Sequence, residues 1–303
     1  MSAQELVSTP TVQMHSAVLA GPHRVQIEHH PKPEPAAGEV LVRVEGCGIC
    51  GSSVPVWDGR PWFTYPLRPG APGHEGWGVV EQVGDHTQAG LIGSRVAFLS
   101  GGAFAEYDVA AAELLVRLPS ELDELPFPGE AFGCVFNAFR RSDVRAGQTV
   151  AVVGMGFFGS AWAQLARAAG ADVREVRRTT DWHSWIERCE RVLEAGGTQA
   201  ALETASQLVA PGGRLIVGAY HQDGLRTVDM QSWNWRGLDV VNAHERDPGV
   251  QHAGMREAAR LAAAGTFDVE ALVTHRFPLR RLADAFGAAS RRPPGFVKAW
   301  VGP

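Results

Sequence analysis

The strongest constraint on the fold is a glycine motif that joins an apolar run to an alanine-rich segment. The run covers 148–153 (QTVAVV), and Gly154, Gly156 and Gly159 follow it at the start of a helix predicted over 160–169. The first glycine permits a tight turn, the second lets the backbone approach a pyrophosphate, and the third allows close packing of helix on strand. An ordinary glycine-rich turn is the alternative. The agreement of strand, glycines and helix favours a dinucleotide-binding unit.

The rest of the chain divides into a β-rich part and a part in which strands and helices alternate. Runs rich in β-branched residues at 40–44, 78–83 and 95–99 lie between glycine and proline residues. From Glu130 onward, the alternation predicts a parallel sheet covered by helices, and therefore an α/β protein with a second, β-rich domain. The later strands are expected at 172–176, 191–195, 213–218, 238–242 and 296–301, and the helices at 130–141, 199–209 and 255–264.

Charge and composition exclude several classes of protein. The 303 residues carry a formal net charge of -5 without a long single-sign tail, which disfavours a general nucleic-acid binder. No apolar stretch has transmembrane length, and the first residues lack the regions of a secretory signal, so we expect no membrane partner. Four cysteines are too few for a disulfide framework in a chain this long, which favours the cytoplasm. Cys47, Cys134 and Cys189 are interpreted as packing residues.

The end of the second predicted strand bears on the choice of nicotinamide cofactor. NAD enzymes usually place an acidic residue there, about 20 residues after the glycine motif, to bind the ribose. In this chain Arg177 and Arg178 follow the strand at 172–176. Because guanidinium binds phosphate in a bidentate manner, the two arginines favour NADP over NAD. A pair of solvated surface arginines is the alternative interpretation.

Three side chains of the types that bind zinc stand in separate segments. Cys50 lies in a glycine-rich turn, His74 lies in the segment 73–76 (GHEG), and Glu130 begins the predicted helix. Thiolate, imidazole and carboxylate are all common ligands of Zn²⁺. Each residue also has an ordinary interpretation, as a core thiol, a buried hydrogen-bonded histidine, and a carboxylate favoured by the helix dipole.

Together these segments resemble the medium-chain dehydrogenase/reductases of the zinc-dependent alcohol dehydrogenase type, in the sorbitol and threonine dehydrogenase branch. The resemblance rests on 48–52 (GICGS), 73–78 (GHEGWG), 101–107 (GGAFAEY), and a helix at 130–141 that begins with glutamate and ends in two arginines. It extends from about residue 16 to the C-terminus. The combination is specific, although each piece alone is not.

The resemblance implies two domains. A GroES-like catalytic domain would comprise 1–129 and 270–303, and a Rossmann domain would comprise 130–269, shortened between its second and fourth strands. Only 179–190 separates the second strand from the segment that resembles the fourth, so a third strand and most of its helix are missing. Trp182 and Trp185 lie in this short connection; they either cap the sheet edge or simply pack, and we favour packing.

The resemblance also implies roles for individual residues. Cys50, His74 and Glu130 would be zinc ligands, Glu75 a ligand or a neighbouring carboxylate, and Ser52 the hydroxyl that relays the substrate proton. The four-cysteine structural zinc lobe of many relatives is absent, so we expect at most one zinc ion per chain. Aspartate is common in this branch where the chain has Ser53, so the loop next to the relay residue differs from the family pattern. The residues expected to bind the cofactor are Gly154, Gly156, Phe157, Phe158, Gly159, Arg177, Arg178 and Lys298, the last at the pyrophosphate.

The implied activity is hydride transfer between NAD(P)(H) and an alcohol or carbonyl substrate, with a polyol, cyclitol or sugar-like alcohol as the hypothesis. Trp57, Asn242 and His244 are candidate substrate contacts, although a surface histidine is an equally good interpretation of the last. Relatives usually form homodimers through the last strands of the Rossmann sheet, here 238–242. A zinc-free reductase of the quinone or enoyl type and a non-catalytic ligand-binding protein are the alternatives.

Overall fold

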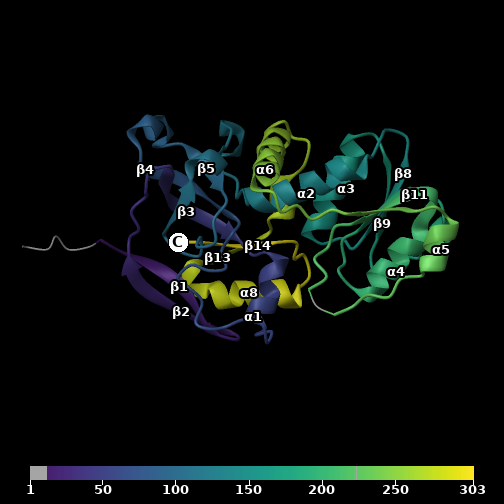
Figure 1. The fold of residues 1–303 in the computed structure, drawn as a ribbon, viewed down its shortest axis with the longest axis horizontal. Helices are drawn as coiled ribbons and strands as arrows, with labels where there is room; N and C mark the ends of the chain where they lie inside the picture. Colours follow the sequence, from purple (N-terminus) through teal and green to yellow (C-terminus); the bar gives the residue numbers. More distant parts are fainter. Residues whose placement is uncertain (1–11, 223) are drawn as a thin grey trace, which may run out of the picture.

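Antiparallel pairing of β-branched segments builds the first of two lobes in the computed structural model, which describes residues 12–222 and 224–303 (Figure 1). Its main sheet has the strand order β13-β14-β3-β4-β5-β7, with β6 paired to β3, and β1 and β2 form a separate hairpin. The first 11 residues of the predicted segment 1–129 lie outside the described residues. The strands of this lobe are β1 (Gln13–Gly21), β2 (Arg24–Pro31), β3 (Glu39–Gly48), β4 (Gly76–Val83), β5 (Arg95–Phe98), β6 (Tyr107–Ala111), β7 (Val116–Arg117), β13 (His275–Pro278) and β14 (Ala299–Gly302).

The end of the chain returns to this first lobe. β14 pairs antiparallel with β3, with Trp300 opposite Gly48, and β13 pairs parallel with β14. Figure 1 shows these yellow strands beside the blue strands of the first half of the chain. The pairing places residues near the C-terminus next to the turn that follows β3.

The second lobe is a parallel sheet with the strand order β12-β11-β10-β8-β9 among the described residues. Because all its strands run in the same direction, their carboxyl ends lie along one edge, where open α/β sheets bind ligands. The predicted α/β fold with a β-rich part and a parallel sheet is confirmed. The strands are β8 (Thr149–Val153), β9 (Asp172–Val176), β10 (Cys189–Glu194), β11 (Val209–Val217) and β12 (Asp239–Asn242).

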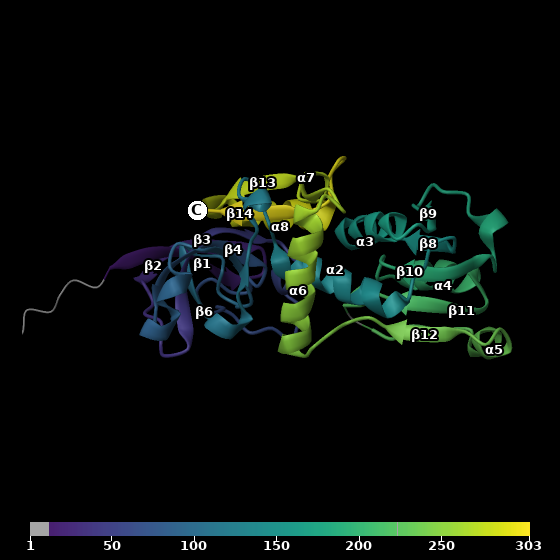
Figure 2. The ribbon, with the colours of Figure 1, turned by 90° about the horizontal axis from the view of Figure 1, so that it is seen from above.

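Helices pack on the parallel sheet, between the lobes and on the β-rich lobe. Those on the β-rich lobe are α1 (Val54–Trp57) and α8 (Leu282–Arg291). The others are α2 (Gly129–Ser142), α3 (Phe157–Ala168), α4 (Gln199–Leu208), α5 (Met230–Trp235), α6 (Pro248–Ala263) and α7 (Val269–Leu272). Figure 2 shows α2 and α6 side by side between the two sheets. In the part of the chain that the structure describes, no helix is both long and apolar enough to cross a lipid bilayer.

The packing of α2 against α6 fixes the start of α2, where Glu130 lies. Gly133 permits a close approach, because a Cβ atom there would lie 2.8 Å from the backbone nitrogen of Met255. Asn137 adds a hydrogen bond from Nδ2 to the carbonyl oxygen of Val250, at 3.1 Å. Phe132 packs in the same apolar cluster as Met255. The helix that carries Glu130 is therefore held rigidly at the boundary between the lobes.

Helix α6 begins seven residues earlier than the sequence predicts, at Pro248 rather than Met255. Asp247 caps it by accepting hydrogen bonds from the backbone N–H groups of Gly249 and Val250. Proline at the first helical position has no N–H to leave unpaired and its φ angle suits a helix. Pro248 and Gly249 are typical of a loop, but here they form the first turn of a helix, which is why the sequence prediction began too late.

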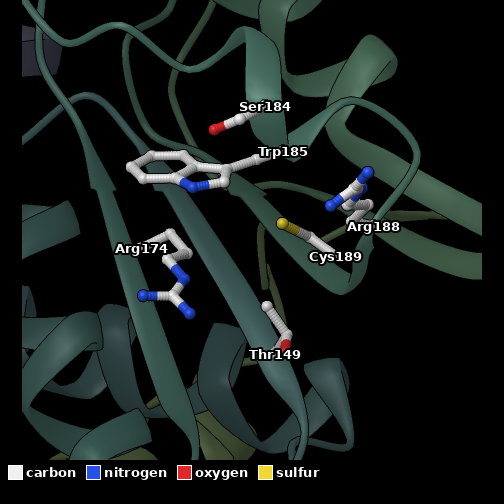
Figure 3. A pocket seen from close by; sticks show the side chains of 6 residues that line it. All are labelled: Thr149, Arg174, Ser184, Trp185, Arg188 and Cys189. Atoms are coloured by element: carbon white, nitrogen blue, oxygen red, sulfur yellow. The ribbon is translucent and has the colours of Figure 1, made fainter.

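The short connection between β9 and β10 leaves β9 at the edge of the sheet. Trp182 and Trp185 pack against the apolar cluster that includes Val153, Val176 and Cys189, and so cover part of the sheet. A hollow of about 340 Å³ remains beside Trp185 (Figure 3). It opens near the amino ends of β8 and β10, away from the carboxyl ends, and is lined by Thr149, Arg174, Ser184, Trp185, Arg188 and Cys189.

This arrangement predicts that Trp185 stabilises the shortened sheet. Trp185→Ala removes a half-buried indole that packs on the sheet and lies 5.8 Å from the guanidinium of Arg174. We expect the free energy of unfolding to fall by about 2 kcal/mol, less than for a fully buried tryptophan. Urea denaturation followed by circular dichroism measures the change. Trp62→Ala, at a position that is 56% exposed, is the control, and an equal effect of both substitutions would show that Trp185 is not needed for packing.

Candidate functional site

The turn after β3 presents Cys50 at the junction between the lobes. Cys50 precedes a short 3-10 turn, Gly51–Ser53, and its backbone is extended. The hydroxyl of Ser52 donates a hydrogen bond to the sulfur of Cys50 at 3.1 Å. Both side chains are half-buried, whereas Ser53 is 2% exposed. The structure thus separates a serine beside the cysteine from a neighbouring serine in the interior.

His74 and Glu75 precede β4 and reach the same place because β4 pairs with β3, Gly76 lying opposite Cys47. The Nδ1 atom of His74 lies 2.8 Å from the carbonyl oxygen of Pro72. A carbonyl can only accept, so Nδ1 carries the proton in this hydrogen bond. A histidine held in this way presents Nε2 as a metal ligand, which is the usual arrangement in metal sites.

Cys50, His74 and Glu75 form a group whose ligand atoms all lie within 4.8 Å of one another. Sulfur, imidazole nitrogen and carboxylate oxygen are the ligand types of a catalytic zinc site, which uses three protein ligands. The Oε2 atom of Glu75 is buried and forms an ion pair with Nζ of Lys298 at 2.7 Å, without a hydrogen bond of good geometry among the described residues. A carboxylate oxygen has more than one lone pair, so Oε2 can contact a metal ion as well as the lysine. The residues present therefore fit a zinc ion.

The electrostatics of the site also favour a cation. Burial lowers the pKa of His74, but the hydrogen bond and charge of Cys50 and the charges of Glu130 and Glu75 outweigh it and raise this pKa to about 10. Burial raises the pKa of Glu130, and the charge of Glu75 raises it further, while the charge of His74 lowers it. The raised pKa of His74 shows that the groups around it favour a positive charge at this place.

Glu130 faces this group from the first turn of α2 but is not one of the three mutually close ligands. The thiol of Cys134 donates a hydrogen bond to Oε1 of Glu130 at 3.2 Å. Burial and the charge of Glu130 raise the pKa of Cys134 well above its usual value. Cys134, interpreted from the sequence as a packing residue, is therefore a hydrogen-bond partner of Glu130. The spacing of four residues along one helix could have indicated this contact.

The structure places Lys298 differently from the sequence prediction that it reaches a cofactor pyrophosphate. Its side chain is only 5% exposed and Nζ lies 2.8 Å from Oε1 and 2.7 Å from Oε2 of Glu75. Nζ also donates to the carbonyl oxygen of Ile49 at 3.3 Å and lies 4.5 Å from the ring centre of Phe157. Pairing of β14 with β3 is the physical reason, because it places Lys298 next to the turn that carries Cys50.

The glycine motif has the geometry of a phosphate-binding turn. Gly154 follows β8 with φ of +100°, a conformation that residues with a Cβ rarely adopt. A Cβ on Gly159 would lie 2.0 Å from the carbonyl oxygen of Gly154, so only glycine allows α3 to approach β8. Gly156 caps α3, whose first N–H groups have no partner within the helix. These N–H groups fit the diphosphate of a dinucleotide.

The two phenylalanines of the motif are half-buried and pack toward the interior. The ring of Phe157 lies 5.1 Å from that of Phe132 and so joins the glycine motif to the start of α2. Phe158 lies close to Gly218, where a Cβ atom would come within 2.8 Å of its ring. Their backbone N–H groups belong to the first turn of α3, whereas their side chains pack.

Arg177 and Arg178 lie at the carboxyl end of β9 and are both exposed. Arg177 donates to Glu175 at 3.1 Å, and Arg167 donates to the same carboxylate at 2.6 Å. Burial raises the pKa of Glu175, but these hydrogen bonds and charges outweigh it and lower the pKa. The carboxylate at this strand end is thus already paired with two guanidinium groups. Arg178 has no ion pair among the described residues.

The three candidate substrate contacts do not meet at the metal group. Trp57 is 6% exposed, because its ring stacks on Phe286 at 5.2 Å in the core of the first lobe. The ring is therefore part of the core of this lobe, and its contact with substrate stays a prediction. Asn242 ends β12 and His244 follows it; both are exposed, and neither belongs to the metal group.

A buried polar network at the carboxyl ends of β10 and β11 was not predicted from the sequence. Glu194 is fully buried and accepts hydrogen bonds from the backbone of Gly196 and Gly197 and from Nε2 of His221, at 2.7–2.9 Å. Arg226 donates to Nδ1 of His221 at 3.0 Å, which makes Nε2 the protonated nitrogen. The pair of glycines after a strand-ending glutamate was the available signal. The network fixes the loop after β11 beside the nucleotide motif.

Two family models match most of the chain. Residues 36–120 match the model described as "Alcohol dehydrogenase GroES-like domain", and residues 169–292 match the model described as "Zinc-binding dehydrogenase". The first match covers the turn with Cys50 and the turn with His74 and Glu75.

Individual relatives agree with these models. An alcohol dehydrogenase of Geobacillus stearothermophilus is 32% identical over 183 residues, 50% of this chain and 54% of that protein, so the chain spans about half of its length. Human sorbitol dehydrogenase is 24% identical over 89% of this chain and 91% of its own. A zinc-binding dehydrogenase of Sinorhizobium meliloti bound to NADP has the same fold, with a TM-score of 0.83 and 24% identity, over 96% of this chain and 100% of that chain.

The site geometry predicts that Gly48 is required for metal binding. A Cβ at position 48 would lie 1.9 Å from Oε2 of Glu75 and 3.0 Å from Cε of Lys298. Gly48→Ala should therefore displace the carboxylate and weaken zinc binding about 10- to 100-fold, as measured by competition with a chelator. Gly51→Ala is the matched control, since no atom lies within 4 Å of its Cβ position. Equal zinc affinity in the two variants would contradict a role of Glu75 at the metal.

Proposed function

Because the chain belongs to the zinc-type alcohol dehydrogenase family, of the sorbitol dehydrogenase type, and is an oxidoreductase, we propose that it transfers hydride between NAD(P)(H) and an alcohol or carbonyl substrate. The observation that carries this proposal is the close group of Cys50, His74 and Glu75 beside the nucleotide motif. It supports a zinc-dependent reaction over the zinc-free reductases considered from the sequence, which have no use for three such ligands.

We propose that Cys50, His74 and Glu75 hold the zinc ion, with Glu130 as a further carboxylate at the site. When bound there, zinc supplies a Lewis acid for the substrate oxygen. Lys298 neutralises one charge of Glu75, and the Nδ1–H of His74 holds its ring in place through Pro72. These contacts set the position of the ligand side chains before any substrate arrives.

Ser52 is the residue proposed to move the substrate proton. Oxidation of an alcohol removes a hydride, which the nicotinamide ring accepts, and a proton, which a nearby group must take. The hydroxyl of Ser52 both donates and accepts, and in the structure it donates to Cys50 at 3.1 Å. In the proposed relay it would accept the hydroxyl proton of the substrate while its own proton passes to the ribose of the bound cofactor and on to solvent, so that Cys50 remains a metal ligand. Ser53 is buried and cannot replace it.

We propose NADP(H) as the favoured cofactor. Gly154, Gly156 and Gly159 would bind the diphosphate, and Arg177 and Arg178 would bind the 2′-phosphate. The pairing of Glu175 with two arginines supports this choice, because a carboxylate so engaged is a poor acceptor for a ribose hydroxyl. The sorbitol dehydrogenase relatives support a polyol, cyclitol or sugar-like alcohol as the substrate class.

Metal analysis and nucleotide titration test the proposal together. We expect about one zinc ion per chain in the wild type, its loss in Cys50→Ala, and tighter binding of NADPH than of NADH. Arg178→Gln should reduce that preference without changing zinc content. Ser52→Ala should retain zinc and nucleotide but lower kcat about 100-fold, with Ser53→Ala as the control.

The contrary outcomes separate the alternatives. Nucleotide binding with no zinc would indicate the zinc-free reductase, and the absence of both would leave a ligand-binding protein without turnover. A full preference for NADPH in Arg178→Gln would remove that arginine from the 2′-phosphate site.

We also propose that the chain forms a homodimer through the edge of the parallel sheet. β12 pairs with β11 on one side only among the described residues, and Trp235 and Met230 beside it are 90% and 61% exposed. An unpaired edge and exposed apolar side chains suit a symmetric interface. Sedimentation velocity should give a dimer for the wild type and monomers for Trp235→Glu. A dimer that this substitution leaves unchanged would place the interface elsewhere.

A further inference from the structure

An arginine that the sequence did not single out lies over the nucleotide motif. Arg292 follows α8, in the β-rich lobe, and its Nη1 atom lies 3.7 Å from the position of a Cβ on Gly156. This is the closest atom to that position apart from the neighbouring residues in the chain. We propose that Arg292 binds the cofactor diphosphate from the opposite lobe, an inference that rests on the proposed nucleotide-dependent function.

A cation beside Gly156 would lie close to the bound diphosphate. Gly156 caps α3, and the missing side chain of this second glycine is what lets a diphosphate approach the backbone. The guanidinium of Arg292 lies beside this opening and is within reach of phosphate oxygens bound there. Helix and arginine would bind the diphosphate from two sides, with charge-assisted hydrogen bonds from each.

Arg292 is available for this role. It has no ion pair with a carboxylate among the described residues, and its side chain is exposed. Its backbone N–H donates to the carbonyl oxygen of Ala288, which fixes the main chain at the end of α8. The guanidinium of Arg292 thus carries a positive charge without a carboxylate partner among the described residues, and the backbone that bears it is held by a hydrogen bond.

The other candidate cation for the diphosphate is occupied elsewhere. Lys298 is buried, with both carboxylate oxygens of Glu75 within 2.8 Å of its Nζ atom. Moving it to a phosphate would leave the buried carboxylate of Glu75 without its partner, which is energetically costly. Arg292 therefore supplies the positive charge that Lys298 does not.

Two probes and two variants test the proposal by titration calorimetry on the zinc-loaded protein. NADPH contains the diphosphate, whereas adenosine 2′-monophosphate lacks it. Arg292→Gln should raise the Kd of NADPH about tenfold or more and leave that of adenosine 2′-monophosphate unchanged. The backbone of Arg292 is left-handed, with φ of +48°. Glutamine has a Cβ atom as arginine does, so the substitution should leave the backbone strain at the end of α8 unchanged.

Arg291→Gln is the matched control, because the guanidinium of Arg291 lies against Gly287 of its own helix and not against the glycine motif. It should leave the Kd of NADPH unchanged. If the wild type binds NADPH and Arg292→Gln binds it within twofold of the wild type, the role of Arg292 is excluded while the proposed function stands. If the wild type binds neither probe, the proposed function fails and this inference fails with it. Equal weakening of both probes in Arg292→Gln would also overturn it.

Discussion

A buried ion pair between Glu75 and Lys298 connects two distant segments of the β-rich lobe. Glu75 stands before β4 and Lys298 stands before β14, 223 positions apart, and both are at most 5% exposed. Two charges taken out of water are tolerable only when each satisfies the other, and removal of one partner typically costs about 3–5 kcal/mol. Gly48 leaves the space in which they meet. The position of the metal-binding turn therefore depends on the correct pairing of β3 with β14.

The ion pair also determines the charge at the candidate metal site. Lys298 pairs with the carboxylate of Glu75, but Cys50 and Glu130 also interact with His74 and, against the effect of burial, raise the pKa of its imidazole to about 10. A divalent cation would favour the same site and would displace the proton from His74, so that its imidazole could bind the metal. The zinc site proposed for this chain thus follows from a group of metal-ligating side chains of which Lys298 neutralises only one.

Local patterns predicted the features that depend on neighbouring residues. The strand, glycines and helix at the nucleotide motif require only adjacent sequence, and the cysteine and histidine turns follow from their spacing and family resemblance. The partner of Lys298 depends on a strand pairing across most of the chain, and no local pattern encodes it. Burial of Trp57 against Phe286 is likewise a contact between distant segments. The early start of α6 was missed for another reason, since Asp247 turns a proline and glycine into a helix cap.

If the chain binds its cofactor as proposed, the shortened sheet places a larger share of cofactor recognition on charge. β9 is the edge strand, so the part of the fold that would flank the adenosine is reduced to a connection carrying Trp182 and Trp185. In the proposed function, the remaining contacts are directed at phosphates, from Arg177 and Arg178 on the parallel sheet and from Arg292 on the other lobe. Contacts from both lobes to one ligand favour the arrangement in which the lobes are close. Nucleotide binding would then position the metal site and the nicotinamide relative to each other through the same interactions that provide affinity.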